Sequence, residues 1–299
     1  MRAFTSACYA VDIGHHSYPM DKYRLVPARL LAEATLSREE LIEPEAATLD
    51  DILRVHTPEY VQAFVNGTLE RKAMLRIGLP WSPELVRRAF AVIGGTIGAT
   101  RLALKEGIAA NLAGGTHHAF ADHGEGYCIF NDMVIAMRRL RADGAARRFL
   151  VVDLDVHQGN GTAALCAGDP EVFTFSMHGE NNYPARKEHG SWDIALPDGV
   201  TDEEYLGRLA RALPQLVERF RPQLLFYQAG VDVLAGDRFG KLALTMEGVG
   251  ERDRLVHDFA HRLGLPLVIT LGGGYARDLE HIVEAHCQTV RIAKREKKG

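Results

Sequence analysis

The sequence predicts an α/β protein with a mainly parallel β-sheet that is covered by helices on both faces. Short runs of almost continuously apolar residues alternate along the chain with longer segments in which apolar residues recur with the period of a helix. Strands that are apolar throughout are typical of parallel sheets, because both of their faces are buried. The 299 residues contain no repeat, no low-complexity segment and no linker rich in Ser, Pro or Gly. This favours a single three-layer α/β/α domain over residues 1–299.

Five strands and five helices are the clearest elements of this alternation. The apolar runs that we expect to be strands are 108–113, 149–156, 172–176, 223–229 and 265–271. The segments with helical periodicity are 84–106, 130–142, 202–219, 246–263 and 278–296. Strands that alternate with helices of this length predict βαβ units, which join neighbouring parallel strands.

The composition is that of an ordinary soluble globular protein, with 46% hydrophobic and 25% charged residues. The net charge of -4 gives no overall signature of nucleic-acid binding. The basic segment 291–299 is interpreted as the end of a helix, where cations interact favourably with the helix dipole. No apolar stretch is long enough for a membrane span, and the segment MRAFTSACYAVDIGHH lacks the hydrophobic region of a signal peptide.

The cysteines lie far apart and form no C-x-x-C motif; they are Cys8, Cys128, Cys166 and Cys287. This spacing argues against a disulfide scaffold and against a zinc site made of thiolates. It favours a reducing compartment, and we therefore expect the protein to be cytoplasmic.

Polar, reactive residues follow four of the predicted strands at the point where each strand ends. In chain order they are the segment GGTHH (114–118), His157, Asp232, and the segment GGGY that ends in Tyr275. In open α/β sheets, ligands bind outside the carboxyl ends of the strands. Polar residues of an ordinary core would not favour one end of four strands. These residues therefore predict a site at that edge.

The segment FLVVDLDVHQGNG (149–161) places Asp153, Asp155 and His157 at alternate positions. Alternate residues of a strand point to the same side, and buried carboxylates are costly unless their charge is compensated. Asp155, His157 and Asp232 offer two oxygen donors and one nitrogen, which is the pattern of a catalytic zinc site with an open position. Alone, the D-x-D-x-H pattern would equally fit a solvated turn or an internal ion pair.

His117 and His118 follow two glycines, and beside a metal a histidine is the natural general acid and base. Asp153 is then the carboxylate that orients one imidazole. Tyr275 follows Gly272–Gly274, whose backbone allows tight turns and the close approach of a ligand. Its hydroxyl would donate to an oxyanion that forms on a substrate carbonyl. A phosphate-binding loop is the alternative, but the segment has no G-x-G-x-x-G or Walker pattern.

Together these residues predict amide hydrolysis without a covalent enzyme intermediate. Water near the metal would lose a proton to a histidine, and Tyr275 would stabilise the tetrahedral oxyanion. A histidine would then return a proton to the leaving nitrogen.

Five segments, in this order and spacing, resemble the histone deacetylase superfamily over nearly the whole chain. They are GGTHHAFADHGEGYCIFND (114–132), VVDLDVHQGNGT (151–162), FSMH (175–178), QAGVDVLAGDRFGKLALT (228–245) and LGGGY (271–275). The compact length and the DVHQGNG form are most similar to class IV deacetylases and to bacterial deacetylase-like amidohydrolases. The resemblance implies an arginase-like fold with a central parallel sheet of eight strands.

The resemblance also implies one Zn²⁺ per chain on the three predicted ligands. It assigns His117 and His118 to a tandem pair that handles water and protons, with His118 as the base, and it assigns Tyr275 to the tyrosine that polarises the carbonyl. Many relatives have Asp where Asn160 stands as the partner of the second histidine. The uncharged amide can still accept a ring N–H, and it should keep His118 neutral.

Further residues are implied to contact the substrate or a structural cation. Gly126, Tyr127 and Tyr183 match the walls of an acyl-lysine tunnel, and we expect Gly273 to contact substrate too. In the entrance segment HSYPMDKYR (16–24), Arg24 resembles the arginine of an internal product channel. A structural K⁺ is implied at Asp153, Asp155, His157, Ser176 and Met177.

The substrate and the oligomeric state remain open from the sequence. The substrate is an acylated lysine in a protein or peptide, a lysine with a longer fatty-acyl chain, or a small acetylated amine such as a polyamine. A binuclear manganese ureohydrolase shares the fold, but it would need more carboxylates after His157, where Gln158, Gly159 and Asn160 stand. It would also leave Tyr275 without a role. A non-catalytic acyl-lysine-binding module is disfavoured because every expected catalytic group is present.

Overall fold

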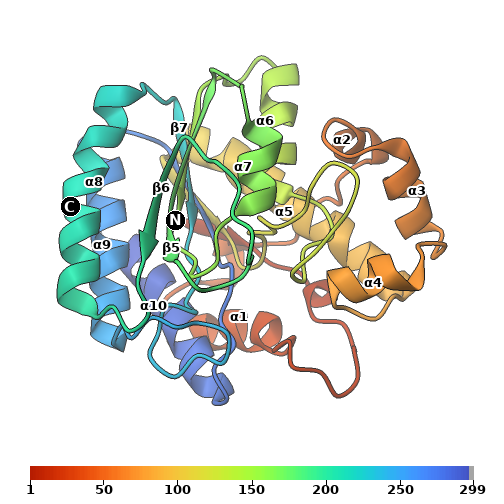
Figure 1. Ribbon diagram of the computed structural model, residues 1–299, viewed down its shortest axis with the longest axis horizontal. Coiled ribbons are helices and arrows are strands. Elements are labelled where there is room, and N and C mark those ends of the chain that lie inside the picture. Colours follow the sequence, from red (N-terminus) through yellow and green to blue (C-terminus); the bar gives the residue numbers. More distant parts are fainter. Residues whose placement is uncertain (296–299) are drawn as a thin grey trace.

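The computed structural model describes residues 1–295, in which eight strands form one sheet with every neighbouring pair parallel (Figure 1). The spatial order is β2-β1-β3-β8-β7-β4-β5-β6. The strands are Arg2–Phe4 (β1), Leu41–Ile42 (β2), Ile108–Asn111 (β3), Phe149–Asp153 (β4), Val172–Gly179 (β5), Trp192–Leu196 (β6), Leu224–Gln228 (β7) and Leu267–Thr270 (β8). This architecture confirms the predicted α/β class and the eight strands that the resemblance implied.

Helices cover both faces of the sheet, which makes three layers (Figure 1). One face carries α1, α8, α9 and α10, the other carries α5, α6 and α7, and α2–α4 extend the second layer outward. Their bounds are Lys22–Ala32 (α1), Leu49–Leu53 (α2), Pro58–Val65 (α3), Arg71–Ile77 (α4), Pro83–Glu106 (α5), Asp132–Ala142 (α6), Asn160–Cys166 (α7), Asp202–Arg219 (α8), Met246–Arg262 (α9) and Leu279–Arg295 (α10).

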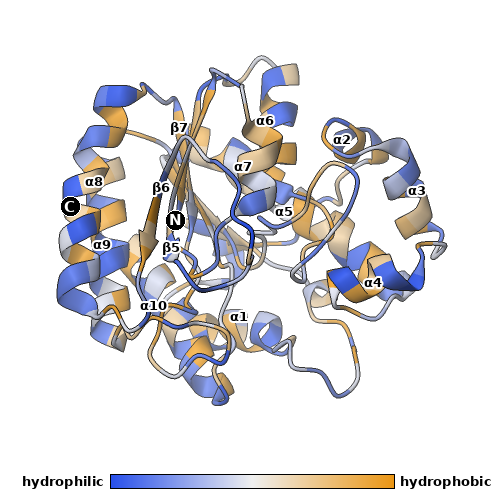
Figure 2. Ribbon diagram, in the orientation of Figure 1, coloured by the Kyte–Doolittle hydropathy of each residue, from blue (hydrophilic) through white to orange (hydrophobic). Residues whose placement is uncertain are grey.

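The alternation of residues along β4 supplies both hydrophobic cores. Leu150 and Val152 belong to the core shared with α8 and α9, whereas Phe149 and Val151 belong to the core shared with α5 and α6. Successive residues of a strand point to opposite faces, so an apolar run fills both layers at once. Figure 2 shows hydrophobic residues along the central strands and hydrophilic ones on the outer side of α8.

The five strands and five helices expected from the sequence are all present in the described residues, with differences at their ends. The run 149–156 is a strand only as far as Asp153, because the chain leaves the ladder there although its apolar residues stay buried. Strand β5 continues to Gly179. The helix predicted for 278–296 is described as Leu279–Arg295; residue 296 and the rest of the basic tail lie outside the described residues.

The sequence pattern missed β1, β2, β6, α1–α4 and α7, most of which are short. Strand β2 has two residues and β1 has three, which is too short for any periodicity. Strand β6 lies at the edge of the sheet, and four of its five residues are only partly buried or exposed. Edge strands therefore lack the continuous apolar pattern that identified the central ones.

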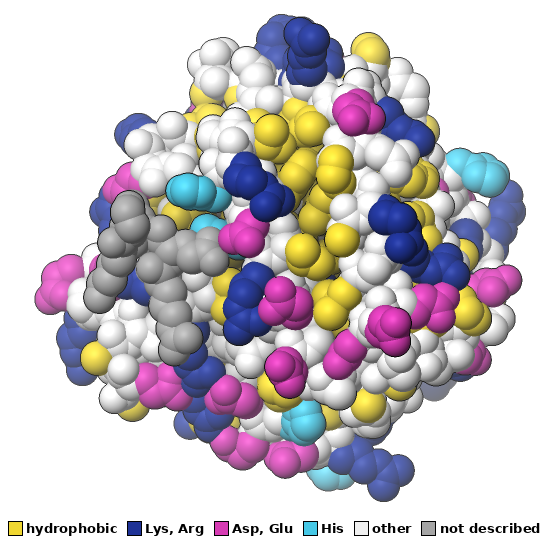
Figure 3. Space-filling model, turned by 90° about the vertical axis from the view of Figure 1, so that its left-hand side faces the viewer, with side chains coloured by type: hydrophobic (Ala, Val, Ile, Leu, Met, Phe, Trp, Pro, Cys, Tyr) yellow, Lys and Arg dark blue, Asp and Glu magenta, His cyan; other side chains and the backbone are white. Residues whose placement is uncertain are grey.

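The surface over α8 and α9 carries Lys, Arg, Asp and Glu side chains interspersed around a band of hydrophobic ones (Figure 3). Within residues 1–295, no helix combines the length and hydrophobicity needed to cross a bilayer. The four cysteines, all within this range, are unpaired.

A buried carboxylate at the start of α6 holds the loop that follows β3. Asp132 accepts hydrogen bonds from the backbone N–H groups of Gly115 and Thr116 (3.1 and 2.7 Å) and from the hydroxyl of Thr116 (2.6 Å). The hydroxyl of Thr96 in α5 donates to it as well (2.5 Å). The next two residues of the loop are His117 and His118. The hydrogen bonds to Asp132 therefore fix the backbone directly before the two histidines.

Replacing Asp132 with Ala should lower the free energy of unfolding by about 3 kcal/mol. The substitution leaves several buried donors without an acceptor, and each such group costs about 1–3 kcal/mol. Urea denaturation followed by circular dichroism measures the loss. Asp143→Ala at the other end of α6 is the control, because Asp143 forms only partly exposed ion pairs with Arg101 and Arg139, for which about 0–1 kcal/mol is expected. Equal losses in the two variants would contradict the role given to Asp132.

Candidate metal centre and active site

Three residues from two neighbouring strands converge at the carboxyl edge of the sheet. Asp155 and His157 follow β4, and Asp232 follows β7. Each offers a ligand atom within 4.8 Å of the other two. Nδ1 of His157 lies 3.0 Å from Oδ1 of Asp155 and 3.1 Å from Oδ2 of Asp232. All three side chains are buried. The structure thus brings together the three predicted ligands.

Backbone amides and glycines hold the two carboxylates in place. The N–H of Gly273 donates to Oδ2 of Asp155 (2.8 Å), and the N–H of Val156 donates to Oδ1 of Asp232 (2.9 Å). A Cβ on Gly273 would lie 1.9 Å from Oδ2 of Asp232, and one on Gly230 would lie 2.2 Å from Oδ2 of Asp155. Gly273, expected from the sequence to contact substrate, therefore packs against the carboxylates.

The charges of this group fit a divalent metal. Burial, and next to it the carboxylate of Asp155, raises the pKa of Asp232 to about 7. Burial alone would lower the pKa of His157, but the two carboxylates outweigh it and raise that pKa to about 10. Tetrahedral zinc with bonds of about 2.0–2.2 Å needs ligand atoms roughly 3.3 Å apart, which is close to the separations of 3.0 and 3.1 Å. Two carboxylates and one imidazole also balance a dication.

His117 lies beside a carboxylate. Its Nδ1 is 2.7 Å from Oδ2 of Asp153, at the end of β4. Burial lowers the pKa of His117, but the charges of Asp153 and Asp155 outweigh burial and raise it to about 9. The neighbouring carboxylates therefore favour the protonated form of this imidazole. Asp153 lies where the sequence predicts the carboxylate that orients one histidine.

His118 lies beside an amide instead. Its Nδ1 is 2.7 Å from Oδ1 of Asn160, and Nδ2 of Asn160 donates to Oε1 of Glu125 (2.7 Å). Because the amide nitrogen is engaged with a carboxylate, Oδ1 faces the ring and Nδ1 of His118 carries the proton. Burial, followed by the positive charges of His117 and His157, holds the pKa of His118 well below its ordinary value. Its Nε2 is thus left as an unprotonated, basic nitrogen.

Tyr275 is buried, with its ring 6.1 Å from that of His157 between centroids. Its backbone N–H donates to Oδ2 of Asp237 (2.6 Å), and its carbonyl accepts from Nε of Arg238 (2.7 Å). Burial raises the pKa of Tyr275 well above its ordinary value. The phenol therefore keeps its proton and can act as a hydrogen-bond donor.

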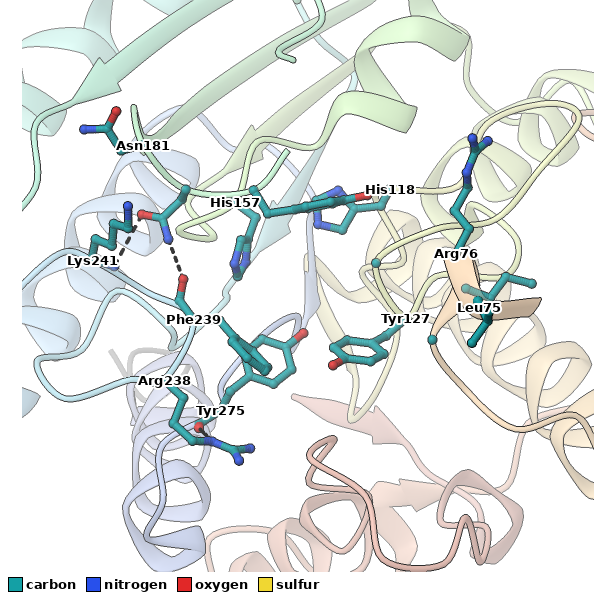
Figure 4. A pocket seen from close by; sticks show the side chains of 15 residues that line it. Leu75, Arg76, His118, Tyr127, His157, Asn181, Arg238, Phe239, Lys241 and Tyr275 are labelled. Carbon is teal, nitrogen blue, oxygen red and sulfur yellow. Dashed lines mark hydrogen bonds between the residues drawn. The ribbon is translucent and has the colours of Figure 1, made fainter. Parts of the chain in front are cut away.

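A pocket of about 490 Å³ leads down to His118 and His157 (Figure 4). Tyr127 and Tyr183 form part of its walls, and the ring of Tyr183 meets that of His118 edge-on, 5.0 Å between centroids. Gly126 has a φ of 55°, and a Cβ there would lie 2.7 Å from Cδ2 of His118. Glycine at this position therefore lets the wall approach the histidine. The three predicted tunnel residues meet at this pocket.

Arg24 lies away from this pocket. Its side chain is 66% exposed and pairs with Asp21 at 3.3 Å. It lines a separate surface cavity formed mainly by residues 10–21. The structure thus does not place Arg24 in an internal channel. Positions two apart on a helix differ by about 200° in direction, so Lys22 of the same helix, rather than Arg24, points inward.

Two buried cations, Lys22 and Arg88, lie behind the site, and the sequence analysis missed both. Nζ of Lys22 donates to the carbonyl of Gly272 (2.8 Å) and lies 5.9 Å from the centre of the Tyr275 ring. Arg88 lines an internal cavity of about 20 Å³ that also contacts His117. Its Nε donates to a backbone carbonyl at 2.7 Å. Nothing in one sequence distinguishes such cations from surface ones.

Other contributors to the site were also missed. Asp237 and Arg238 hold the backbone of Tyr275, Glu125 orients Asn160, and Phe239 lies 5.1 Å from Tyr275 between ring centroids. All but Glu125 belong to the single segment 236–239, which the sequence analysis quoted without assigning roles to its members.

The residues predicted to hold K⁺ lie at the end of β4, just after it, and within β5. Asp153 and Ser176 are partners across the two strands, and Met177 follows. The hydroxyl of Ser176 is 2.9 Å from Nδ1 of His178. This arrangement does not test for a cation, and K⁺ stays a prediction.

The comparison with known families decides the assignment. A profile described as "Histone deacetylase domain" matches residues 16–290. The chain belongs to the histone deacetylase family. This confirms the resemblance seen in the sequence motifs.

This histone deacetylase family member is 46% identical, over 279 residues, to an uncharacterised Picosynechococcus protein, with 93% of each chain covered. It is 30% identical over 281 residues to histone deacetylase 2 of Arabidopsis thaliana, which covers 90% of this chain and 72% of that protein. A crystal structure of a histone deacetylase homologue from Aquifex aeolicus matches 98% of this chain and 83% of its own, with a TM-score of 0.84. At 23% identity, that likeness shows the fold.

Proposed function

We propose that this protein is a zinc-dependent amidohydrolase that removes an acyl group, in the first place acetyl, from an acylated lysine or a related amine. The observation that carries the proposal is the buried group Asp155, His157 and Asp232, of which His157 lines one pocket together with His118 and Tyr275. Membership of the histone deacetylase family supports it. The charge and spacing of the donor atoms support one Zn²⁺ per chain.

A zinc ion on these three ligands would polarise the substrate carbonyl and lower the pKa of water. The chain itself supplies binding and proton transfer. The aromatic walls Tyr127 and Tyr183 suit an unbranched aliphatic arm and exclude bulk water around it. Such a pocket directs the amide at the end of the arm toward the buried donors.

His118 acts as the general base in this proposal. It is neutral at neutral pH, since its pKa lies well below the ordinary value. Its Nδ1–H donates to Asn160, so Nε2 takes the proton from the attacking water. As the carbonyl becomes tetrahedral, the hydroxyl of Tyr275 donates to the oxyanion. Asp153 raises the pKa of His117, and a positive charge on His117 lowers the pKa of His118, which favours the unprotonated form of His118.

Collapse of the tetrahedral species breaks the C–N bond. His118, now an imidazolium, gives its proton to the leaving nitrogen, so that the amine departs neutral and the acyl group leaves as a carboxylic acid. Water has then supplied the hydroxyl to the acid and the proton to the amine.

Longer fatty-acyl lysines and acetylated polyamines are the alternative substrates. A panel of lysine peptides with acyl chains of increasing length, together with acetylated polyamines, separates them by kcat/KM. Hydrolysis of none of these amides would refute the proposed function. Remote alternatives are a binuclear manganese ureohydrolase and a non-catalytic binding module. The first is disfavoured because Gln158 and Asn160, which follow the ligand His157, are amides engaged in hydrogen bonds.

A structural K⁺ near Asp153 and Ser176 and a cytoplasmic location are part of the same proposal. The four unpaired cysteines support a reducing compartment.

Asp232→Ala should lose both the metal and the activity, because only two of three ligands remain. Zinc per chain, measured by mass spectrometry of the purified protein, should fall from one to near zero. Asp143→Ala, the same change at the surface, should keep its zinc. Full zinc occupancy in the Asp232 variant would show that the ligand assignment is wrong.

Tyr275→Phe should keep the fold and the zinc but lower kcat about 10²–10³-fold, the usual loss when one oxyanion donor is removed. Tyr127→Phe is the matched control, because it also removes a tyrosine hydroxyl from the pocket wall. The hydroxyl of Tyr127 lies 3.3 Å from that of Ser17 and has no part in the proposed chemistry. That variant should stay within about threefold of wild type. A similar small effect for Tyr275→Phe would remove this residue from the mechanism.

Asn160→Asp should move the acidic limb of the kcat/KM profile to higher pH. A negative charge beside His118 favours its protonated form and raises its pKa by about 1–3 units, and the base works only above its pKa. The acidic limb of the kcat/KM profile gives the pKa of the general base, here His118, in the free enzyme.

Because Asn160 donates to Glu125, the cleanest version is the double variant Asn160→Asp with Glu125→Gln. It exchanges the two functional groups without changing the net charge. Glu125→Gln alone is the control. A limb that stays in place or moves to lower pH in the double variant would show that residue 160 does not tune the base.

A further inference from the structure

The mouth of the pocket presents three cations and no carboxylate. Of the fifteen residues that line the pocket, all within the described part of the chain, none is Asp or Glu. Arg76, Arg238 and Lys241 lie on three sides of it (Figure 4). The apolar residues Leu75 and Phe239 also line the pocket and are 70% and 39% exposed. The opening is therefore apolar and positively charged.

Two of these cations are available to a ligand. Arg76 is exposed at the end of α4. Lys241 is 50% exposed on its side chain, and Asp198 lies 3.8 Å away, itself 47% exposed. Such exposed pairs are weak. Arg238 is different, because its guanidinium donates to the backbone carbonyls of Tyr275 and Ser17. It adds positive charge to the rim, but its hydrogen bonds are used to hold these two backbone segments.

Among the nearby carboxylates, Asp122 is exposed, pairs with His123, and lies close enough to Arg76 for that cation to help lower its pKa. Two others are engaged in hydrogen bonds. Glu125 accepts a hydrogen bond from Asn160. Asp237 accepts from the backbone N–H groups of Phe239, Gly240 and Tyr275. The excess of positive charge is local, since the chain as a whole has a net charge of -4 and the face over α8 mixes both signs (Figure 3).

We propose that this rim selects acyl-lysines that lie in acidic segments of a protein, and that it disfavours acetylated polyamines and lysines with basic neighbours. The inference rests on the proposed function, because it assumes that an acylated amine enters this pocket. When the side chain of the modified lysine fills the pocket, its neighbours in the chain stay at the mouth. An extended peptide spans about 3.3 Å per residue, so the residues one and two positions away lie over the rim.

Charge alone then distinguishes the alternative substrates. Asp or Glu at those positions meets Arg76 and Lys241, whereas Lys or Arg meets charges of its own sign. An acetylated polyamine keeps protonated amines close to the amide and brings them against the same cations. The alkyl parts of acidic side chains can contact Leu75 and Phe239.

The test uses three acetyl-lysine peptides that differ only in flanking residues, which are acidic, neutral or basic, together with an acetylated polyamine. We expect kcat/KM to be about threefold to tenfold higher for the acidic peptide than for the basic one, the range that two exposed charge pairs provide. The difference should shrink at about 1 M salt, where the screening length falls to about 3 Å.

Arg76→Gln and Lys241→Gln should each reduce the acidic-to-basic ratio of kcat/KM about twofold to threefold. Lys105→Gln is the matched control, because Lys105 is an exposed cation at the far end of α5, and its ratio should equal that of wild type. Neither rim residue has a part in the proposed chemistry.

The outcomes separate this inference from the proposed function. Activity on the neutral peptide with equal rates on acidic and basic ones would overturn the role of the rim and leave the hydrolase assignment intact. A polyamine hydrolysed better than every peptide would overturn it as well. Loss of the acidic preference in Lys105→Gln as much as in the rim variants would show that net charge, and not the rim, selects substrate. Hydrolysis of no peptide and no polyamine would refute the proposed function itself.

Discussion

Two buried carboxylates that approach one imidazole determine the arrangement of the rest of the site. Asp155 and Asp232 both approach Nδ1 of His157 at 3.0–3.1 Å, and neither could stay ionised there without donors. Each has one oxygen on a backbone N–H. That arrangement requires the backbone to come closer than any Cβ permits, which explains the glycines at 230 and 273. Glycine is therefore needed at these two strand ends because the backbone packs directly against the buried carboxylates.

The sheet makes this convergence possible from residues far apart in the chain. The strands that carry the site are β3, β4, β7 and β8, and in space they are contiguous, in the order β3-β8-β7-β4. Because all are parallel, their carboxyl ends meet at one edge. The tandem histidines, the three predicted metal ligands and Tyr275 each follow the end of a strand, and this places them at the same edge of the sheet.

Central strands and long helices could be predicted from the sequence. A strand buried on both faces is a continuous apolar run, and a helix buried on one face has apolar residues at the helical period. The predicted ligand set and the orienting role of Asp153 followed from residue type at strand ends, whereas the pairing of Asn160 with His118 was implied only by the family resemblance. Lys22 could not be distinguished from Arg24 without knowing the phase of α1, which the mixed pattern of residues 22–32 does not reveal. Asp237 and Glu125 act through single hydrogen bonds across the fold, and such contacts have no local signature.

The two adjacent histidines show how one residue type acquires two electrostatic states. Both are buried, and burial alone would make both neutral. Asp153 supplies a full charge to His117 and reverses the effect of burial, whereas Asn160 offers His118 only a neutral acceptor. The proton on His117 then acts on its neighbour, with ring centroids 4.2 Å apart, and lowers the pKa of His118 further. The pair is therefore coupled: whatever neutralises Asp153 would also make His118 easier to protonate. The difference between one carboxylate and one amide, on a shared loop, is enough to produce a charged group and a base side by side.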